Sequence, residues 1–177
     1  HGDAILISKS KLPVSNTGWA QGGIAVVLDK SDSIEAHVQD TLVAGAGLCD
    51  EPAVRKIIEA APEAIQRIIG WGFDVDRGAD KAPALGREGG HSARRIIHSH
   101  GDATGAELAR CLIEKARATP NIRLFEDCFA LDLLTPTSSD GAPCMGAITH
   151  HPRYGLQIVW ARATVLAPAQ GGGSRAF

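Results

Sequence analysis

A short apolar run near the start of the chain, Ala4-Ile5-Leu6-Ile7, has no polar residue between its members. A strand with one face in water would alternate apolar and polar residues. An uninterrupted run is typical of a strand that is buried on both faces of a parallel sheet. Parallel strands are joined by crossover connections, which usually contain a helix. The apolar run, taken over residues 4–8, therefore predicts an α/β fold.

Three helices are predicted after this strand. Asp32 and Glu35 have the spacing of a capping box and open a helix that continues to about Ala44. Thr104 and Glu107 have the same spacing and open the last of the three helices. The middle helix, over residues 50–69, carries apolar residues at helical spacing, which predicts one buried face. These residues are Val54, Ile57, Ile58, Ala61, Ile65, Ile68 and Ile69.

Strand-like segments follow the last helix. They lie within residues 122–134, 144–150 and 156–167, and turn-forming residues separate them. Short turns between successive strands favour an antiparallel meander. The order of elements predicts a parallel sheet with an added antiparallel layer. Residues 76–103 have no clear period, and a loop of that length in a compact domain is usually functional.

Composition excludes several classes of function. The 18 basic and 20 acidic residues give a formal charge of −2, so no nucleic acid or anionic membrane is expected as a partner. No apolar run reaches the roughly 18 residues that span a bilayer. The four cysteines contain no CxxC pair, which favours reduced thiols in the cytoplasm. Because the chain opens at His1 without a methionine, we expect it to be an internal piece of a larger protein.

Residues 16–23, Asn-Thr-Gly-Trp-Ala-Gln-Gly-Gly, form the first candidate binding loop. Small residues alternate with amide and hydroxyl groups, and the adjacent glycines allow backbone N–H groups to point at one ligand. On spacing alone, a turn that links strand and helix is the slightly favoured interpretation. Residues 86–95 are a second candidate, because one carboxylate, three arginines and a histidine lie between glycines. They could hold an anion, but a solvated loop whose charges pair with one another is favoured.

The histidines His91, His98 and His100 match no known metal-ligand spacing, so no metal site is predicted.

Several runs, taken together, resemble one family. Residues 19–25, Trp-Ala-Gln-Gly-Gly-Ile-Ala, are similar to the flavin loop of the succinate dehydrogenase/fumarate reductase flavoprotein superfamily. Further runs resemble the L-aspartate oxidase family within it and occur in order over nearly the whole chain. These runs are residues 32–38, 40–42, 44–50, Arg87-Glu88-Gly89-Gly90-His91-Ser92 with 94–96, Asp102-Ala103-Thr104-Gly105, and 120–123.

The resemblance implies an FAD-binding Rossmann-like domain with an antiparallel β-meander, of which residues 1–177 are a part. The first strand and the glycine turn that seats the pyrophosphate would precede Ala4, and the capping and C-terminal regions would follow Phe177. The implied activity is oxidation of L-aspartate to iminoaspartate on the route to quinolinate and NAD, with oxygen or fumarate as electron acceptor. Quinolinate synthase is the implied protein partner, and the cytoplasm is the implied location.

The resemblance also implies roles for single residues. Glu88 matches a carboxylate near the substrate amino group, where it would pair with the ammonium and separate aspartate from succinate. Asn16 stands where succinate and fumarate enzymes carry a histidine bonded to FAD, which implies a noncovalent flavin. The implied FAD contacts are Lys9, Asn16, Thr17, Gly18, Trp19, Ala20, Gln21, Gly22, Gly23 and Phe129.

Two alternatives stay open. The chain could belong to a paralogous succinate- or fumarate-type oxidoreductase, or it could be a catalytically silent fragment or an interaction module. The family has Ala-Thr-Gly-Gly near its final strand, whereas residues 167–172 here are longer and contain Pro168. This departure falls where the resemblance implies part of the FAD contact.

Overall fold

The computed structural model describes residues 2–136 and 141–167. The departure at Pro168 therefore lies outside the described residues. The chain forms two compact units. The residues up to Asn16, together with those from Ile113 onward, make up one, which we call the strand unit. Thr17–Leu112 make up the other, which we call the helix unit.

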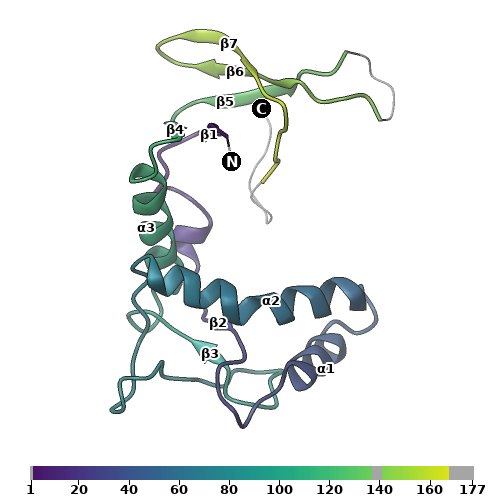
Figure 1. The fold of residues 1–177 in the computed structure, drawn as a ribbon, viewed down its shortest axis with the longest axis vertical. Helices are drawn as coiled ribbons and strands as arrows, with labels where there is room; N and C mark the ends of the chain where they lie inside the picture. The colour runs from purple at the N-terminus through teal and green to yellow at the C-terminus, as the bar shows by residue number, and fades with distance from the viewer. Residues whose placement is uncertain (1, 137–140, 168–177) are drawn as a thin grey trace. The chain divides into compact units, whose positions relative to one another are not determined.

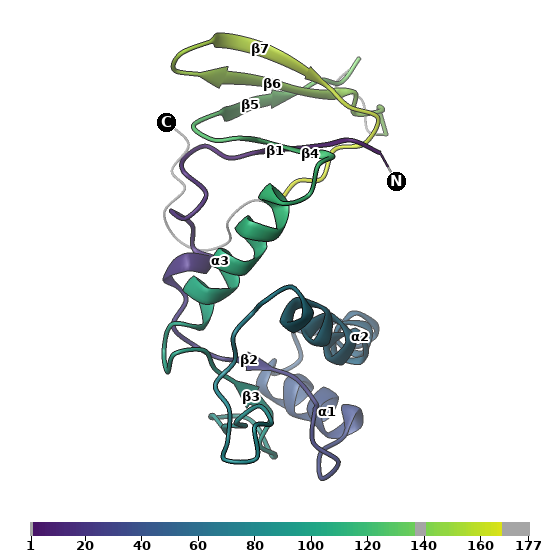
Figure 2. The same cartoon turned by 60° about the vertical axis from the view of Figure 1, so that its left-hand side comes forward.

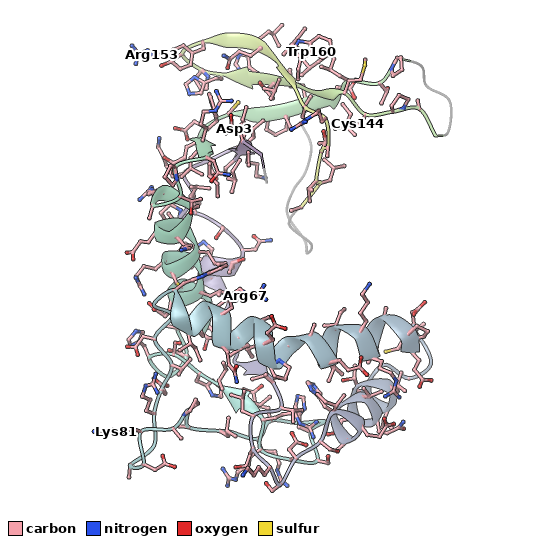
Figure 3. The ribbon with its side chains drawn as sticks, viewed as in Figure 1. Asp3, Arg67, Lys81, Cys144, Arg153 and Trp160 are labelled. Carbon is pink, nitrogen blue, oxygen red and sulfur yellow. The ribbon has the colours of Figure 1, made fainter. Side chains whose placement is uncertain are left out.

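The strand unit contains a parallel pair and an antiparallel meander, as predicted (Figures 1 and 2). In the parallel pair, Ala4 lies opposite Ile122 and Ile7 opposite Phe125. The meander has the order β5-β6-β7, and its last strand ends at Trp160 rather than continuing to residue 167. Figure 3 shows Arg153 at the turn before β7 and Trp160 at the far end of that strand. The strands are β1 (Ala4–Ile7), β4 (Ile122–Phe125), β5 (Phe129–Leu133), β6 (Gly146–His151) and β7 (Gly155–Trp160).

The helix unit places two helices against each other and adds a short antiparallel pair of strands (Figures 1 and 2). The strands β2 and β3 have only two residues each, too few for a periodicity to predict them. The elements are η1 (Thr17–Trp19), β2 (Ile24–Ala25), α1 (Ile34–Ala44), α2 (Glu51–Gly70), β3 (Ile96–Ile97) and the start of α3 (Thr104–Arg117). None of the helices in the described part of the chain is long and apolar enough to cross a bilayer.

The core of the helix unit confirms most of the predicted apolar stripe. Ile58 and Ile65 of α2 are buried, whereas Ile57 is 69% exposed. The buried core cluster joins α2 to the segment after it, to β2 and β3, and to α3. Its members are Val26, Ile65, Phe73, Val75, Ile97 and Cys111.

The capping of two helices differs from the prediction, although α3 begins at Thr104 as expected. Asp50, where the middle helix was predicted to begin, caps α2, and its side chain accepts from the Ala53 N–H. The cap of α1 is Ser33, because Asp32 is taken up by a buried arginine described below. At the start of α3, the Glu107 carboxylate accepts from the Asp74 N–H at 3.0 Å. The side chains of both predicted capping boxes have other partners. Asp32 binds Arg95 and Glu35 binds Arg55, while Thr104 accepts from the Ser99 N–H and Glu107 from the Asp74 N–H.

Candidate functional site

The first half of the candidate loop is packed on the first turn of α3. The Ala20 carbonyl accepts a hydrogen bond from the Gly105 N–H at 3.0 Å. A Cβ atom at Gly105 would lie 2.0 Å from the Thr17 carbonyl oxygen and 2.6 Å from that of Ala20. Only glycine permits backbones to approach this closely. The Asp-Ala-Thr-Gly motif therefore supplies the glycine on which the loop rests.

The second half of the loop ends beside His98. The antiparallel pairing of β2 and β3 sets Ile24 opposite Ile97, so the residues that flank this pair also lie close together. A Cβ atom at Gly23 would lie 2.3 Å from Ile96 Cγ2 and 2.8 Å from His98 Nε2. The pairing thus brings the end of the loop to the imidazole ring of His98.

The same imidazole contacts the sequence-predicted catalytic residue. His98 Nε2 lies 3.0 Å from Oε1 of Glu88, whose side chain is 51% exposed. A carboxylate can only accept, so Nε2 carries the proton and donates. Glu88 is brought to this position because Gly86, two residues earlier, donates its N–H to the Ile96 carbonyl at 2.8 Å. Glu88 and the end of the candidate loop therefore meet at one place in the helix unit.

The loop presents an open face. The Trp19 side chain is 78% exposed, and Thr17, Ala20, Gln21 and Gly22 are exposed as well. Within the described residues, the N–H groups of Gln21 and Gly22 donate to no protein acceptor. A Cβ atom at Gly22 would have no neighbour within 4 Å. The loop therefore offers backbone donors next to unfilled space.

Two further predicted site residues, Lys9 and Phe129, lie together in the strand unit. The Ser8 carbonyl accepts from the Cys128 N–H at 2.8 Å. Lys9 and Phe129 each follow one of these bonded residues, so both lie at the carboxyl end of β1. In α/β sheets, ligands bind beyond the carboxyl ends of the strands. Asn16, the first residue of the loop, is exposed and is the last residue of the strand unit before Thr17 begins the helix unit.

Arg95 has a role that the sequence analysis missed. Its side chain is fully buried, and it donates to both Asp32 oxygens at 2.8 and 2.7 Å and to Asp40 at 2.5 Å. Asp40 Oδ2 also accepts from the N–H and the hydroxyl of Ser92, both at 2.7 Å. Arg95 is therefore committed to two carboxylates and is not available to an anionic ligand. The favoured picture of a solvated loop is also wrong for this residue, because its ion pairs are buried.

Hydrogen bonds within this network lower the pKa values of Asp32 and Asp40. The Ser92 N–H and, after it, the Ser92 hydroxyl and Arg95 lower the pKa of Asp40 to about 2, against the opposing effect of burial. Burial acts to raise the pKa of Asp32, but Arg95 and the Ser33 N–H outweigh it, so that pKa also lies below its usual value. Both carboxylates are therefore ionised at neutral pH.

A buried histidine adjoins the same network. Burial and the nearby Arg95 charge lower the pKa of His37, so its imidazole is neutral at pH 7. Its ring lies 5.7 Å from that of His91, centroid to centroid. Its Nδ1 atom has no hydrogen-bond partner among the described residues. In the same part of the chain, no group of three or more histidine, cysteine, aspartate or glutamate side chains is arranged to hold a metal ion.

A cavity of about 360 Å³ lies in the strand unit, between the parallel pair and the meander. Its walls are mostly apolar, and Thr149 and Gln157 are its polar residues. The full lining is Ile5, Ile7, Phe125, Cys128, Thr149, Gln157, Ile158, Val159 and Trp160. It contains none of the predicted site residues, so we do not assign it to the site.

Comparison with known proteins gives consistent matches. L-aspartate oxidase 1 of Ralstonia nicotianae is 47% identical over 97% of this chain and 33% of its own length. L-aspartate oxidase of Vibrio cholerae is 43% identical over the whole of this chain and 34% of its own length. The chain thus spans about a third of these curated relatives. Among solved structures, a quinol fumarate reductase of E. coli superposes with a TM-score of 0.76 at 30% identity, over 82% of this chain and 24% of that one.

The family model described as "FAD binding domain" matches residues 1–176, which include both the strand unit and the helix unit. The chain therefore belongs to the FAD binding domain family.

Proposed function

We propose that the full-length polypeptide carrying this chain is a flavin-dependent L-aspartate oxidase, which oxidises L-aspartate to iminoaspartate on the route to quinolinate and NAD. The strongest support is the similarity to named relatives together with the position of Glu88. Relatives that are 41–47% identical over at least 82% of the chain bear that name. Glu88, the residue expected to recognise an ammonium group, lies where the glycine loop ends.

The chain suits a flavin at the glycine loop. The N–H groups of Gln21 and Gly22, which donate to no acceptor among the described residues, can donate to ring or phosphate oxygens, and a Cβ atom at Gly22 would meet nothing within 4 Å, which leaves room for a ligand. We propose that residues 16–23 hold the flavin and that Lys9 and Phe129 contact its adenosine half. Asn16 has no imidazole to form a covalent link, so the flavin is held noncovalently. When bound, FAD supplies the hydride-accepting chemistry that no amino-acid side chain provides.

Glu88 would recognise the substrate through its charge. One carboxylate oxygen is bonded to His98, and its side chain is half exposed, so the other oxygen can accept from the ammonium of L-aspartate. A charge-assisted hydrogen bond of this kind is about twice as strong as a neutral one. Succinate has no ammonium and leaves this acceptor without a partner. Glu88 therefore favours the amino acid over the plain dicarboxylate.

The proposal extends to the partners of the reaction. Oxygen or fumarate is the proposed terminal electron acceptor, and quinolinate synthase is the proposed recipient of the imine product. We place the enzyme in the cytoplasm, since the four cysteines, all within the described residues, form no disulfide.

The test uses the full-length polypeptide. We expect flavin absorbance in the purified protein and peroxide formation, or fumarate consumption, that depends on L-aspartate. Glu88→Gln should raise the KM for L-aspartate by about tenfold or more, because a hydrogen bond to a charged group is lost. Glu59→Gln, an exposed carboxylate on α2, is the matched control and should not change it. Absence of flavin absorbance, or an unchanged KM in the Glu88 variant, would contradict the proposal.

A second candidate is a paralogous succinate- or fumarate-type oxidoreductase, which the fumarate reductase superposition favours. The same assay separates the two. Oxidation of succinate, or reduction of fumarate, without any turnover of L-aspartate would support the paralogue. A purified full-length protein that binds FAD but converts none of these substrates would favour a catalytically silent protein.

A further inference from the structure

We propose that His98 is a positioning residue for Glu88. Its imidazole holds the Glu88 carboxylate in the orientation that accepts the substrate ammonium, and this contact makes His98 a determinant of selectivity between L-aspartate and succinate. The inference rests on the proposed function, and it names a residue that none of the family motifs in the sequence analysis singled out.

The His98 ring is held between two glycine backbones. A Cβ atom at Gly23 would lie 2.8 Å from its Nε2, and a Cβ atom at Gly86 would lie 3.2 Å from its Cε1. Any larger residue at Gly23 would need the ring to move. The backbone of His98 is fixed as well, because its carbonyl accepts from the Asp76 N–H at 2.8 Å. The imidazole is therefore pre-positioned by the fold, with 27% of its side chain exposed.

Glu88, in contrast, has little else to orient it. It lies in a glycine-rich segment, with Gly86 before it and Gly89 and Gly90 after it, and its side chain is half exposed. Among the described residues, His98 is the one group that bonds its carboxylate. An exposed glutamate without this bond would keep its rotamer freedom, which ligand binding would have to remove. The rigid ring of His98 removes that freedom in advance.

The two carboxylate oxygens of Glu88 have different partners. Oε1 accepts from His98 at 3.0 Å. The other oxygen remains for a ligand, and only a ligand with a donor, such as an ammonium, uses it. Loss of His98 should therefore weaken binding of L-aspartate and leave binding of succinate almost unchanged. A residue that merely stabilised the fold would affect both ligands alike.

The variants exploit the position of the donor atom. The side-chain nitrogen of glutamine reaches about as far as histidine Nε2, whereas the shorter asparagine does not. We expect His98→Leu and His98→Asn to raise the KM for L-aspartate by about tenfold, and His98→Gln to recover most of the loss. His100→Asn is the matched control, because it removes a more exposed imidazole two residues away. That exchange also keeps a residue type that tolerates the positive φ of 51°.

The measurements use the full-length, flavin-loaded protein. Steady-state kinetics give the KM for L-aspartate and the inhibition constant for succinate. Calorimetry on protein reduced with dithionite gives the dissociation constant of L-aspartate without turnover. Weaker binding of L-aspartate in the leucine and asparagine variants, with succinate within about twofold of wild type, supports the role of His98. Should His98→Leu not fold, the asparagine and glutamine pair carries the same comparison.

Two results would overturn the inference. One is a His98→Asn protein that binds L-aspartate as tightly as wild type. The other is an equal loss of affinity for L-aspartate and succinate. Both refute the role of His98 while the wild-type enzyme still oxidises L-aspartate. A wild-type protein that binds flavin but neither binds nor oxidises L-aspartate refutes instead the proposed function on which the inference rests.

Discussion

Replacing Arg95 by methionine tests whether the buried ion-pair network holds the helix unit together. Asp32 and Asp40 expose only 1% and 17% of their side chains, so both carboxylates would be left without their cation in a poorly solvated site. Removing one partner of a buried ion pair costs about 3–5 kcal/mol. Methionine fills similar space, so most of the loss would come from the unpaired charges rather than from a cavity.

The loss should be concentrated in the helix unit. The Val26 N–H donates to the Arg95 carbonyl at 2.8 Å, and Val26 is part of the buried core. Hydrogen exchange at Val26 in the full-length protein should therefore speed up strongly in Arg95→Met. Denaturant unfolding followed by the same exchange signal gives the change in free energy. Exchanging Asp32 and Asp40 for asparagine in the same protein should recover part of the loss, because the uncompensated charges are then gone.

An exposed ion pair supplies the control. Arg67 and Glu63 on α2 are 57% and 80% exposed, and such a pair four residues apart on a helix contributes about 0.3–0.5 kcal/mol. Arg67→Met should therefore be nearly neutral. If Arg95→Met were no more destabilising than Arg67→Met, the network would contribute little to stability and our reading of it would be wrong.

Three further predictions concern Asp40, Gly105 and Glu107. Asp40 has a pKa of about 2 against an ordinary 3.8, so its stabilising effect is complete above pH 3.8 and should fade as the pH falls toward 2. The stability of Asp40→Asn, measured as acid unfolding by circular dichroism, should therefore depend less steeply on pH than that of the wild type. Gly105→Ala would press a methyl group on the Thr17 carbonyl and should lower the measured affinity for FAD, whereas Gly70→Ala, which meets nothing within 4 Å, should leave it unchanged. Glu107→Gln should cost about 1.5–3 kcal/mol in denaturant unfolding, because this buried carboxylate bonds Arg110 and the Asp74 N–H; a change below 0.5 kcal/mol would contradict that.

Local pattern was sufficient for the larger elements. The uninterrupted run at Ala4–Ile7 predicted a buried parallel strand; the structure pairs it in parallel with Ile122–Phe125, but the burial prediction is wrong for this chain, since Ala4 and Leu6 are exposed. The stripe along α2 predicted its buried face, because a helix of that length repeats its pattern several times. The meander followed from three strands with short turns between them. In each case the relevant information lies within a few neighbouring residues, so sequence alone could determine the outcome.

Contacts between distant residues decided the rest. Family resemblance predicted Glu88 and the glycine loop as site residues, but nothing in the sequence indicated that they lie close together. That reason is the two-residue pairing of β2 with β3, which joins positions more than 70 apart and sets His98 between Gly23 and Glu88. In the same way, Arg95 is not available to an anionic ligand, because it binds Asp32 and Asp40, which lie more than 50 residues away in the sequence. The sequence shows which side chains are charged, but it does not show which partner each one binds. That partner is determined by folding, because a charge removed from water must be paired.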